Sequence, residues 1–187
     1  ATDDYRASID DLIFYPARIN NYLQSRKSLG RVALISSHLG LLNVDLELAA
    51  DLSGANMAQT RRKFLRVHRI LLEALVNASE SFDIVLIDCP PNFNIVTKNA
   101  IVASDHILIP AKPDYLSTWG ISYLIRNVRE LEHEFNEYAE KDGNVVPINL
   151  NQLGVVFTMV QYYSNAPIST QQQYINQIKQ LDLVPVF

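Results

Sequence analysis

The stretch Phe82-Asp83-Ile84-Val85-Leu86-Ile87-Asp88-Cys89-Pro90-Pro91 joins an apolar run to an abrupt polar end. Residues 84–87 lack the polar alternation of a half-exposed strand, so they predict a strand covered on both faces, as in a parallel sheet. Asp88 follows at the carboxyl end of that strand, and Pro90 and Pro91 then stiffen the backbone. Because ligands of open parallel sheets bind beyond the carboxyl ends of the strands, this stretch is the first candidate for a functional site.

Apolar runs typical of strands alternate with helical periodicities along the rest of the chain. Further strands are predicted at residues 32–35, 106–110 and 153–158. Helices are predicted on either side of Pro16 and at residues 43–52, 57–78, 96–103 and 168–181, and another long helix is expected to be capped by Ser117 or Thr118.

This alternation indicates βαβ units with right-handed crossovers. We therefore predict one α/β domain over residues 1–187, with a doubly wound, mainly parallel sheet and helices on both faces. Residues 84–87, 107–109 and 155–157 are expected to form adjacent parallel strands.

Bulk composition excludes several classes of protein. Hydrophobic residues make up 48% and charged residues 19% of the chain, which is typical of a globular protein and not of a disordered one. No apolar run reaches the roughly 18 residues of a membrane-spanning helix. The net charge of −4 argues against a protein that coats nucleic acid through its overall field. Cys89 is the only cysteine, so no internal disulfide can form, and we expect a cytoplasmic location.

The carboxylate of Asp88 carries the sharpest chemical hypothesis. Phosphate-transferring enzymes hold Mg²⁺, often through water, at a carboxylate on the tip of a buried strand. The alternative is an aspartate that only caps the strand or the following turn. Pro90 and Pro91 favour the first interpretation, because they form a stiff turn leading into a segment that could sense a phosphate.

The same ten residues, 82–91, resemble the Walker B and switch segment of ParA-type ATPases. The resemblance covers most of the chain from about Ser8 onward and follows the family's order and spacing. Its other segments are residues 34–39, 97–100, 103–105, 107–110, 115–116 with Gly120, and 153–159. Together they are specific for the family, and less specific between ParA proteins and relatives such as MinD-like cell-division ATPases.

The resemblance implies a P-loop NTPase-like fold, the cofactors ATP and Mg²⁺, and ATP hydrolysis that drives dimerisation and cargo positioning in plasmid or chromosome partition. Asp88 would be the catalytic residue that orients the water shell of Mg²⁺. Pro90 and Pro91 would couple the γ-phosphate to an interface. Thr158 and Met159 fall where the family has its adenine pocket, and for Met159 ordinary core packing is an equal alternative. The implied partners are a second copy of the chain and a partner partition protein.

The chain departs from the family pattern at the phosphate-binding loop. None of its six glycines is followed by lysine, so the motif G-x-x-x-x-G-K-[ST] is absent, as is the family's aspartate-rich segment. We interpret the chain as a fragment cut at both ends and expect it neither to hydrolyse ATP nor to bind it tightly. The missing strand would leave a central sheet edge open, so self-association is also expected.

Contact with DNA is a further expectation from the resemblance, through Arg126 and Arg129 in the predicted long helix. Nearby glutamates dilute this positive charge. Another helix carries five basic residues within residues 61–69, which we interpret as a solvated face. Cys89 lacks the nearby arginine of a phosphatase nucleophile, and the four histidines form no zinc motif.

Two alternative functions stay open. One is a MinD-like positioning ATPase, which would need a membrane-binding terminal helix that this sequence does not contain. The other is a non-catalytic interaction module with the same fold. Titration of the full-length parent with Mg-ATP separates the module from both ATPases.

Overall fold

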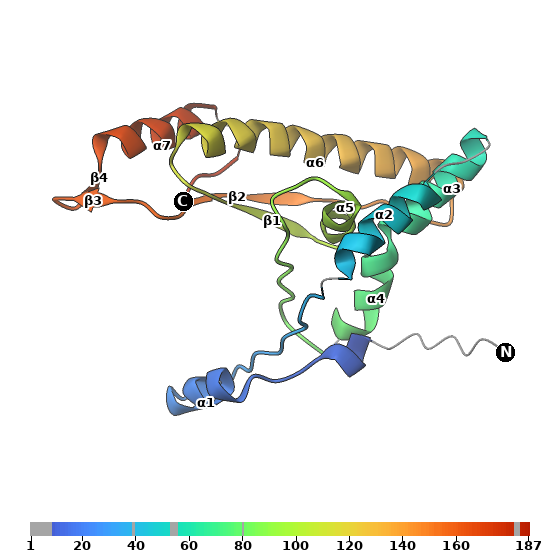
Figure 1. The fold of residues 1–187 in the computed structure, drawn as a ribbon, viewed down its shortest axis with the longest axis horizontal. Coiled ribbons are helices and arrows are strands. Elements are labelled where there is room, and N and C mark those ends of the chain that lie inside the picture. The colour runs from blue at the N-terminus through green and yellow to red at the C-terminus, as the bar shows by residue number, and fades with distance from the viewer. Residues whose placement is uncertain (1–8, 39, 53–55, 80, 182–183) are drawn as a thin grey trace.

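A computed structural model describes residues 9–38, 40–52, 56–79, 81–181 and 184–187. Its elements, in chain order, are η1 (Ile9–Leu12), α1 (Ala17–Ser25), α2 (Leu41–Asp51), α3 (Met57–His68), α4 (Ile70–Ser79), α5 (Ile95–Val102), β1 (His106–Ala111), α6 (Tyr115–Asp142), β2 (Asn151–Phe157), β3 (Tyr162–Tyr163), β4 (Ala166–Pro167) and α7 (Ser169–Leu181). Figure 1 shows α6 running along the molecule above β1 and β2, with α2 to α5 gathered at one end and α7 beside the other.

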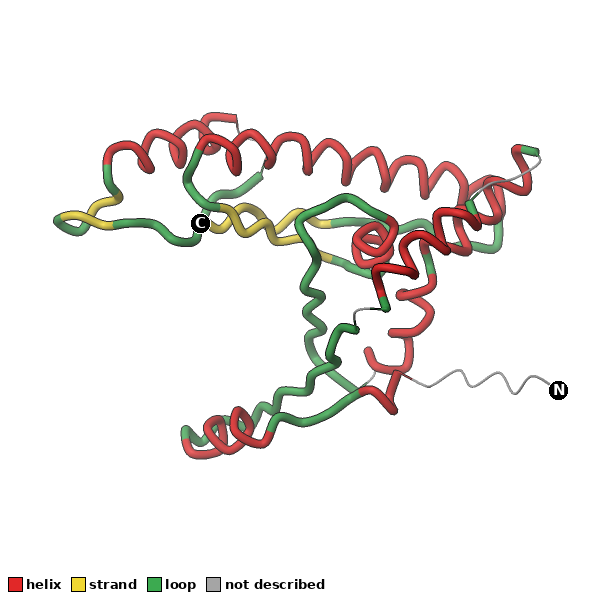
Figure 2. Tube along the Cα trace, viewed as in Figure 1, coloured by secondary structure: helices red, strands yellow, loops and turns green. Residues whose placement is uncertain are grey.

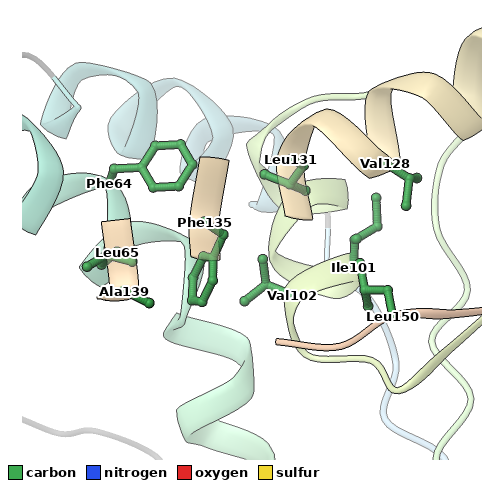
Figure 3. Packing of buried hydrophobic residues seen from close by; sticks show 9 residues of the cluster. All are labelled: Phe64, Leu65, Ile101, Val102, Val128, Leu131, Phe135, Ala139 and Leu150. Carbon is green, nitrogen blue, oxygen red and sulfur yellow. The ribbon is translucent and has the colours of Figure 1, made fainter. Parts of the chain in front are cut away.

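The long helix α6 organises the core. Its apolar residues recur every three or four positions, as a single buried face requires. Near its start, Ile121 and Ile125 pack against the sheet and α7. Further along, Leu131 and Phe135 pack against α3 and α5. The second of these clusters, which Figure 3 shows from close by, consists of Phe64, Leu65, Ile101, Val102, Val128, Leu131, Phe135, Ala139 and Leu150.

Strands β1 and β2 pair in parallel, with α6 as the crossover between them. This confirms the predicted α/β class and two of the three expected parallel strands. Alternate residues of β1 face the helices: Ile109 and Ala111 are buried, whereas Leu108 is 50% exposed. Val186 makes an isolated parallel bridge to Val155 on the other edge of β2.

The prediction of a strand at residues 84–87 is wrong. This segment is irregular in the structure, as the loop colour between α4 and α5 in Figure 2 shows. Ile84 is 76% and Leu86 90% exposed. A strand needs a neighbour that satisfies its backbone hydrogen-bonding groups. Among the described residues no such neighbour lies beside this segment, so the three-strand arrangement is not formed.

The prediction of a buried strand at residues 32–35 is also wrong. Leu34 makes an isolated antiparallel bridge to Phe14 and is 48% exposed. Val32 is held instead by the side chain of Asn20 in α1, whose amide accepts from the Val32 N–H at 2.8 Å and donates to its carbonyl at 2.9 Å. The segment is therefore tied to a surface helix and does not enter the sheet.

Two helix details also differ from the sequence prediction. The helix expected at residues 57–78 is interrupted at Arg69, between α3 and α4. The long helix begins one turn earlier than predicted, because Asp114, and not Ser117 or Thr118, is its N-cap. The Asp114 carboxylate accepts from the Ser117 N–H at 2.8 Å, and this hydrogen bond lowers the pKa of Asp114.

His68, at the end of α3, is almost fully buried and stacks on Phe64 with ring centroids 4.0 Å apart. Its Nδ1 lies 2.8 Å from the Phe64 carbonyl oxygen and so carries the proton. Nε2 is buried with no partner in the described part of the chain. Burial lowers the pKa of His68, and the charge of Lys98 lowers it further, while the bond to Phe64 acts in the opposite direction.

This burial predicts a loss of stability in mild acid. As pH falls below 6.5, the unfolded chain takes up a proton on His68 that the folded chain resists, so the folded state loses at most about 1.4 kcal/mol per pH unit. Urea unfolding at several pH values measures this slope. We expect a smaller slope in His68→Gln than in the wild type. Equal slopes in the wild type and His68→Gln would contradict the prediction.

Gly154 allows the segment 184–187 to approach β2. Its φ is +139°, and a Cβ atom there would lie 2.4 Å from the Pro185 carbonyl oxygen. That oxygen accepts a 2.8 Å hydrogen bond from the Val155 N–H. Gly154→Ala should therefore displace residues 184–187 and cost about 1–3 kcal/mol of unfolding free energy.

A matched control for Gly154→Ala lies in α6. Gly120 has nothing within 4 Å of its ideal Cβ position, so Gly120→Ala should stabilise the chain by about 0.5–1 kcal/mol. Chemical denaturation measures both variants. An unchanged or raised stability in Gly154→Ala would show that the contact with Pro185 is not required.

Candidate functional site

The carboxyl ends of β1 and β2 are joined directly. Thr158 donates its backbone N–H to the Ala111 carbonyl at 2.8 Å, and its hydroxyl lies 3.4 Å from the same oxygen. Thr158 and the turn after β1 therefore stand side by side at the sheet edge where α/β proteins bind ligands. The side of Thr158 away from the sheet is exposed.

Met159 follows with left-handed backbone, φ +57°, which is uncommon for a residue with a side chain. Its side chain is 70% exposed, so ordinary core packing is excluded. The loop is fixed from α7: Gln171 accepts from the Gln161 N–H at 2.7 Å and donates to the Met159 carbonyl at 3.5 Å. Met159 is thus an exposed thioether on an anchored turn, beside Thr158.

Asp88 lies on the irregular segment between α4 and α5. Its carboxylate is exposed and makes no hydrogen bond or ion pair to any described residue. Partial burial of the thiol, followed by the negative charge of Asp88, raises the pKa of Cys89. A raised pKa keeps the thiol protonated near neutral pH, which fits the interpretation that Cys89 is not a nucleophile.

The turn at Pro90 and Pro91 leads into α5, whose first turn is held by two side chains. Asn94 is the N-cap and accepts from the Thr97 N–H at 3.0 Å. Asp45, on α2, accepts from the Ile95 N–H at 3.0 Å. Sequence analysis missed Asp45, because a contact across fifty residues leaves no local pattern. The Asp88–Pro91 turn is therefore linked through α5 to α2.

The described residues supply only part of a magnesium–nucleotide site. Asp88 offers one carboxylate, and no group of three His, Cys, Asp or Glu side chains in the described part could hold a metal ion. The glycine–lysine motif that surrounds a triphosphate is absent from the 187 residues. Among the described residues, no hydrogen bond or ion pair joins Asp88 to Thr158 or Met159. These residues alone do not fit a bound Mg-ATP.

Arg126 and Arg129 are both exposed on α6. The Arg126 guanidinium lies over the Tyr123 ring at 5.6 Å and 3.6 Å from Glu130. No ion pair is found for Arg129 among the described residues. Arg66 on α3 pairs with Asp51 at 3.0 Å, and Arg69, which follows α3, pairs with Glu73 at 3.3 Å, so part of the positive charge of residues 61–69 is already compensated.

Two solved structures share the fold of this chain. The chain superposes on apo McdA from Cyanothece with a TM-score of 0.68 at 20% identity, covering 96% of this chain and 58% of that one. It also superposes on cobyrinic acid a,c-diamide synthase from Mycobacterium smegmatis, solved with ADP and magnesium, with a TM-score of 0.57 at 18% identity, covering 84% and 53%. The fold is that of the P-loop NTPases.

The family follows from sequence. A family model described as "AAA domain" matches residues 1–141. Chromosome partitioning protein ParA of Caulobacter vibrioides is 35% identical over 99 residues, which are 52% of this chain and 36% of that protein. Cell division protein PomZ of Myxococcus xanthus is 27% identical over 138 residues, 74% of this chain and 39% of that protein. The chain belongs to the ParA-type ATPase family, and it spans well under half of these relatives. No described helix is long and apolar enough to cross a membrane.

Proposed function

We propose that this chain is part of an ATPase that positions cargo by ATP-dependent dimerisation, as in plasmid or chromosome partition. Support comes from family membership and from the junction of Ala111 with Thr158, which sets an anchored, exposed Met159 at the ligand-binding edge of the sheet. The named relatives act in chromosome partition and in cell division. The cargo class and the homodimer are part of the proposal.

Each site residue has a role in this proposal. Asp88 would hold Mg²⁺ through water, and the ion would screen the phosphate charge. Thr158 and Met159 would lie against the adenine, since a polarizable thioether packs well on an aromatic ring. Pro90 and Pro91 would couple the γ-phosphate to an interface through α5. Asp45 and Asn94 hold the first turn of α5 by hydrogen bonds. The phosphates themselves require a glycine–lysine loop supplied by other residues.

The nucleotide prediction has two parts. This chain alone should give no micromolar affinity for Mg-ATP in calorimetry, because Asp88 repels a triphosphate that no loop neutralises. In a longer protein that carries the loop, Asp88→Asn should reduce hydrolysis by about 100-fold or more. Asp83→Asn, an exposed acidic residue of the same segment, is the control and should keep its rate.

Micromolar binding of Mg-ATP to this chain would refute the first part, and full hydrolysis by Asp88→Asn would refute the second. If the longer protein carries no loop and does not bind Mg-ATP, a non-catalytic module replaces the ATPase. If it hydrolyses ATP and also attaches to membranes, a MinD-like role replaces partition.

Binding of DNA phosphates through Arg126 and Arg129 stays a prediction. Arg129 is the more available of the two, because the Arg126 guanidinium is shared with Tyr123 and Glu130. Alanine at both positions should weaken binding to duplex DNA and reduce the slope of log affinity against log salt by about 0.9 for each lost phosphate contact. Arg18→Ala, on the exposed face of α1, is the control. The same slope of log affinity against log salt in all variants would show that these arginines do not contact DNA phosphates.

A further inference from the structure

Residues 158–161, which we call the Met159 turn, have an uncommon backbone conformation. The φ of +57° at Met159 lies in the left-handed region, which residues with a side chain seldom adopt. The side chain of Met159 is 70% exposed, so its own packing contributes little to this conformation. On the sheet side, the Thr158 N–H donates to the Ala111 carbonyl at 2.8 Å. That bond fixes only the beginning of the turn.

The rest of the Met159 turn is held by one side chain from α7. Gln171 accepts from the Gln161 N–H at 2.7 Å and donates to the Met159 carbonyl at 3.5 Å. A single amide thereby bonds to the backbone on both sides of Val160. The acceptor bond is the stronger of the two, because 3.5 Å is at the long limit for a hydrogen bond.

The hairpin of β3 and β4 brings Gln171 back to this turn. Figure 1 shows the hairpin at the end of the molecule where α7 begins. Ser164 and Asn165, at its tip, have φ angles of +49° and +64°, as a type I′ turn requires. At its base, the Ile168 N–H donates to the Gln161 carbonyl at 2.9 Å. Both backbone groups of Gln161 are therefore bonded to the beginning of α7.

The helix that carries Gln171 is itself fixed to the sheet. Ile178 is buried in the same cluster as Val155 of β2, and Ile175 is buried as well. These two side chains, and not Gln171, secure α7. Replacement of Gln171 should therefore free the Met159 turn and leave the helix in place.

We propose that Gln171 is a positioning residue that holds the Met159 thioether in place for the base of the nucleotide. The inference rests on the proposed ATPase and concerns only the adenine end of its substrate. Gln171 acts through the turn and contacts no reacting group. Without its amide, the Gln161 N–H and the Met159 carbonyl lose their partner. The turn then relaxes toward negative φ, and the Met159 side chain changes direction.

The two methionines of the chain allow a direct test, because labelling with methyl-¹³C methionine gives two NMR signals. In Gln171→Ala the Met159 signal should move, whereas the signal of Met57, on α3, should stay. Gln171→Glu keeps an acceptor for the Gln161 N–H, so it should restore most of the wild-type position. Gln173→Ala, an exposed glutamine two residues further along α7, is the matched control and should move neither signal.

Kinetics of a longer protein that hydrolyses ATP then test the link to the nucleotide. Gln171→Ala should raise KM for ATP about fivefold, as expected for one lost hydrogen bond, and leave kcat near the wild-type value. A change in KM alone is expected because the substitution alters contact with the base and not with the phosphates. Gln171→Glu should recover most of the loss, and Gln173→Ala should match the wild type.

Three results would overturn the proposal. The first is a Met159 signal that does not move in Gln171→Ala. The second is movement of both methionine signals, which would indicate a general loss of structure. The third is an unchanged KM, or an equal fall in kcat, in a variant whose Met159 signal does move.

Failure of the proposed ATPase gives a different result. The wild-type longer protein would then bind no ATP, while the Met159 signal of the present chain would still move in Gln171→Ala. Gln171 would in that case fix the turn without any role toward a nucleotide, and the positioning proposal would be refuted together with the ATPase.

Discussion

The apolar stripe of α6 is the constraint on which the rest of the structure depends. One end of it, at Ile121 and Ile125, covers the β1–β2 sheet, and the other end, at Leu131 and Phe135, holds α3 and α5. A single helix thereby contributes to both hydrophobic clusters, and Ile107 of β1 also packs against both. Loss of either half of this stripe would separate the sheet from the helical end of the molecule.

Polar side chains on α6 set the register of the sheet that the stripe covers. Asn136 accepts from the Ile148 N–H and donates to its carbonyl, both at 2.8 Å, and Glu132 accepts from the Leu150 N–H at 2.8 Å. These bonds fix the chain just before β2 begins. The position of Thr158 at the end of β2 therefore follows from contacts made on α6, far from the site itself.

The features predicted correctly from the sequence are helices and strands with a clear local pattern. The features that were missed depend on contacts with residues elsewhere in the fold. The periodicity of α6 and the apolar runs of β1 and β2 specify those elements, and β1 and β2 each find a partner strand in the other. Residues 84–87 have an equally apolar run, but a strand forms only where another strand accepts its backbone. Asp45 was missed for the same reason, since its partner at Ile95 lies on a different helix. Thr158 and Met159 were placed correctly at the end of a strand, whereas Asp88 was not.

The candidate site is divided between two parts of the molecule. Thr158 and Met159 are fixed by hydrogen bonds to Ala111 and Gln171, so their half of the site is formed by the sheet and α7 alone. Asp88 has only the turn that leads to α5 to position it. Asp45 joins the start of α5 to α2 through its hydrogen bond with the Ile95 N–H. A contact that fixed Asp88 would therefore also act on this hydrogen bond, through the turn that leads into α5. An additional strand beside residues 84–87 would supply that contact, and it would at the same time cover Ile84 and Leu86, the most exposed apolar side chains of the segment.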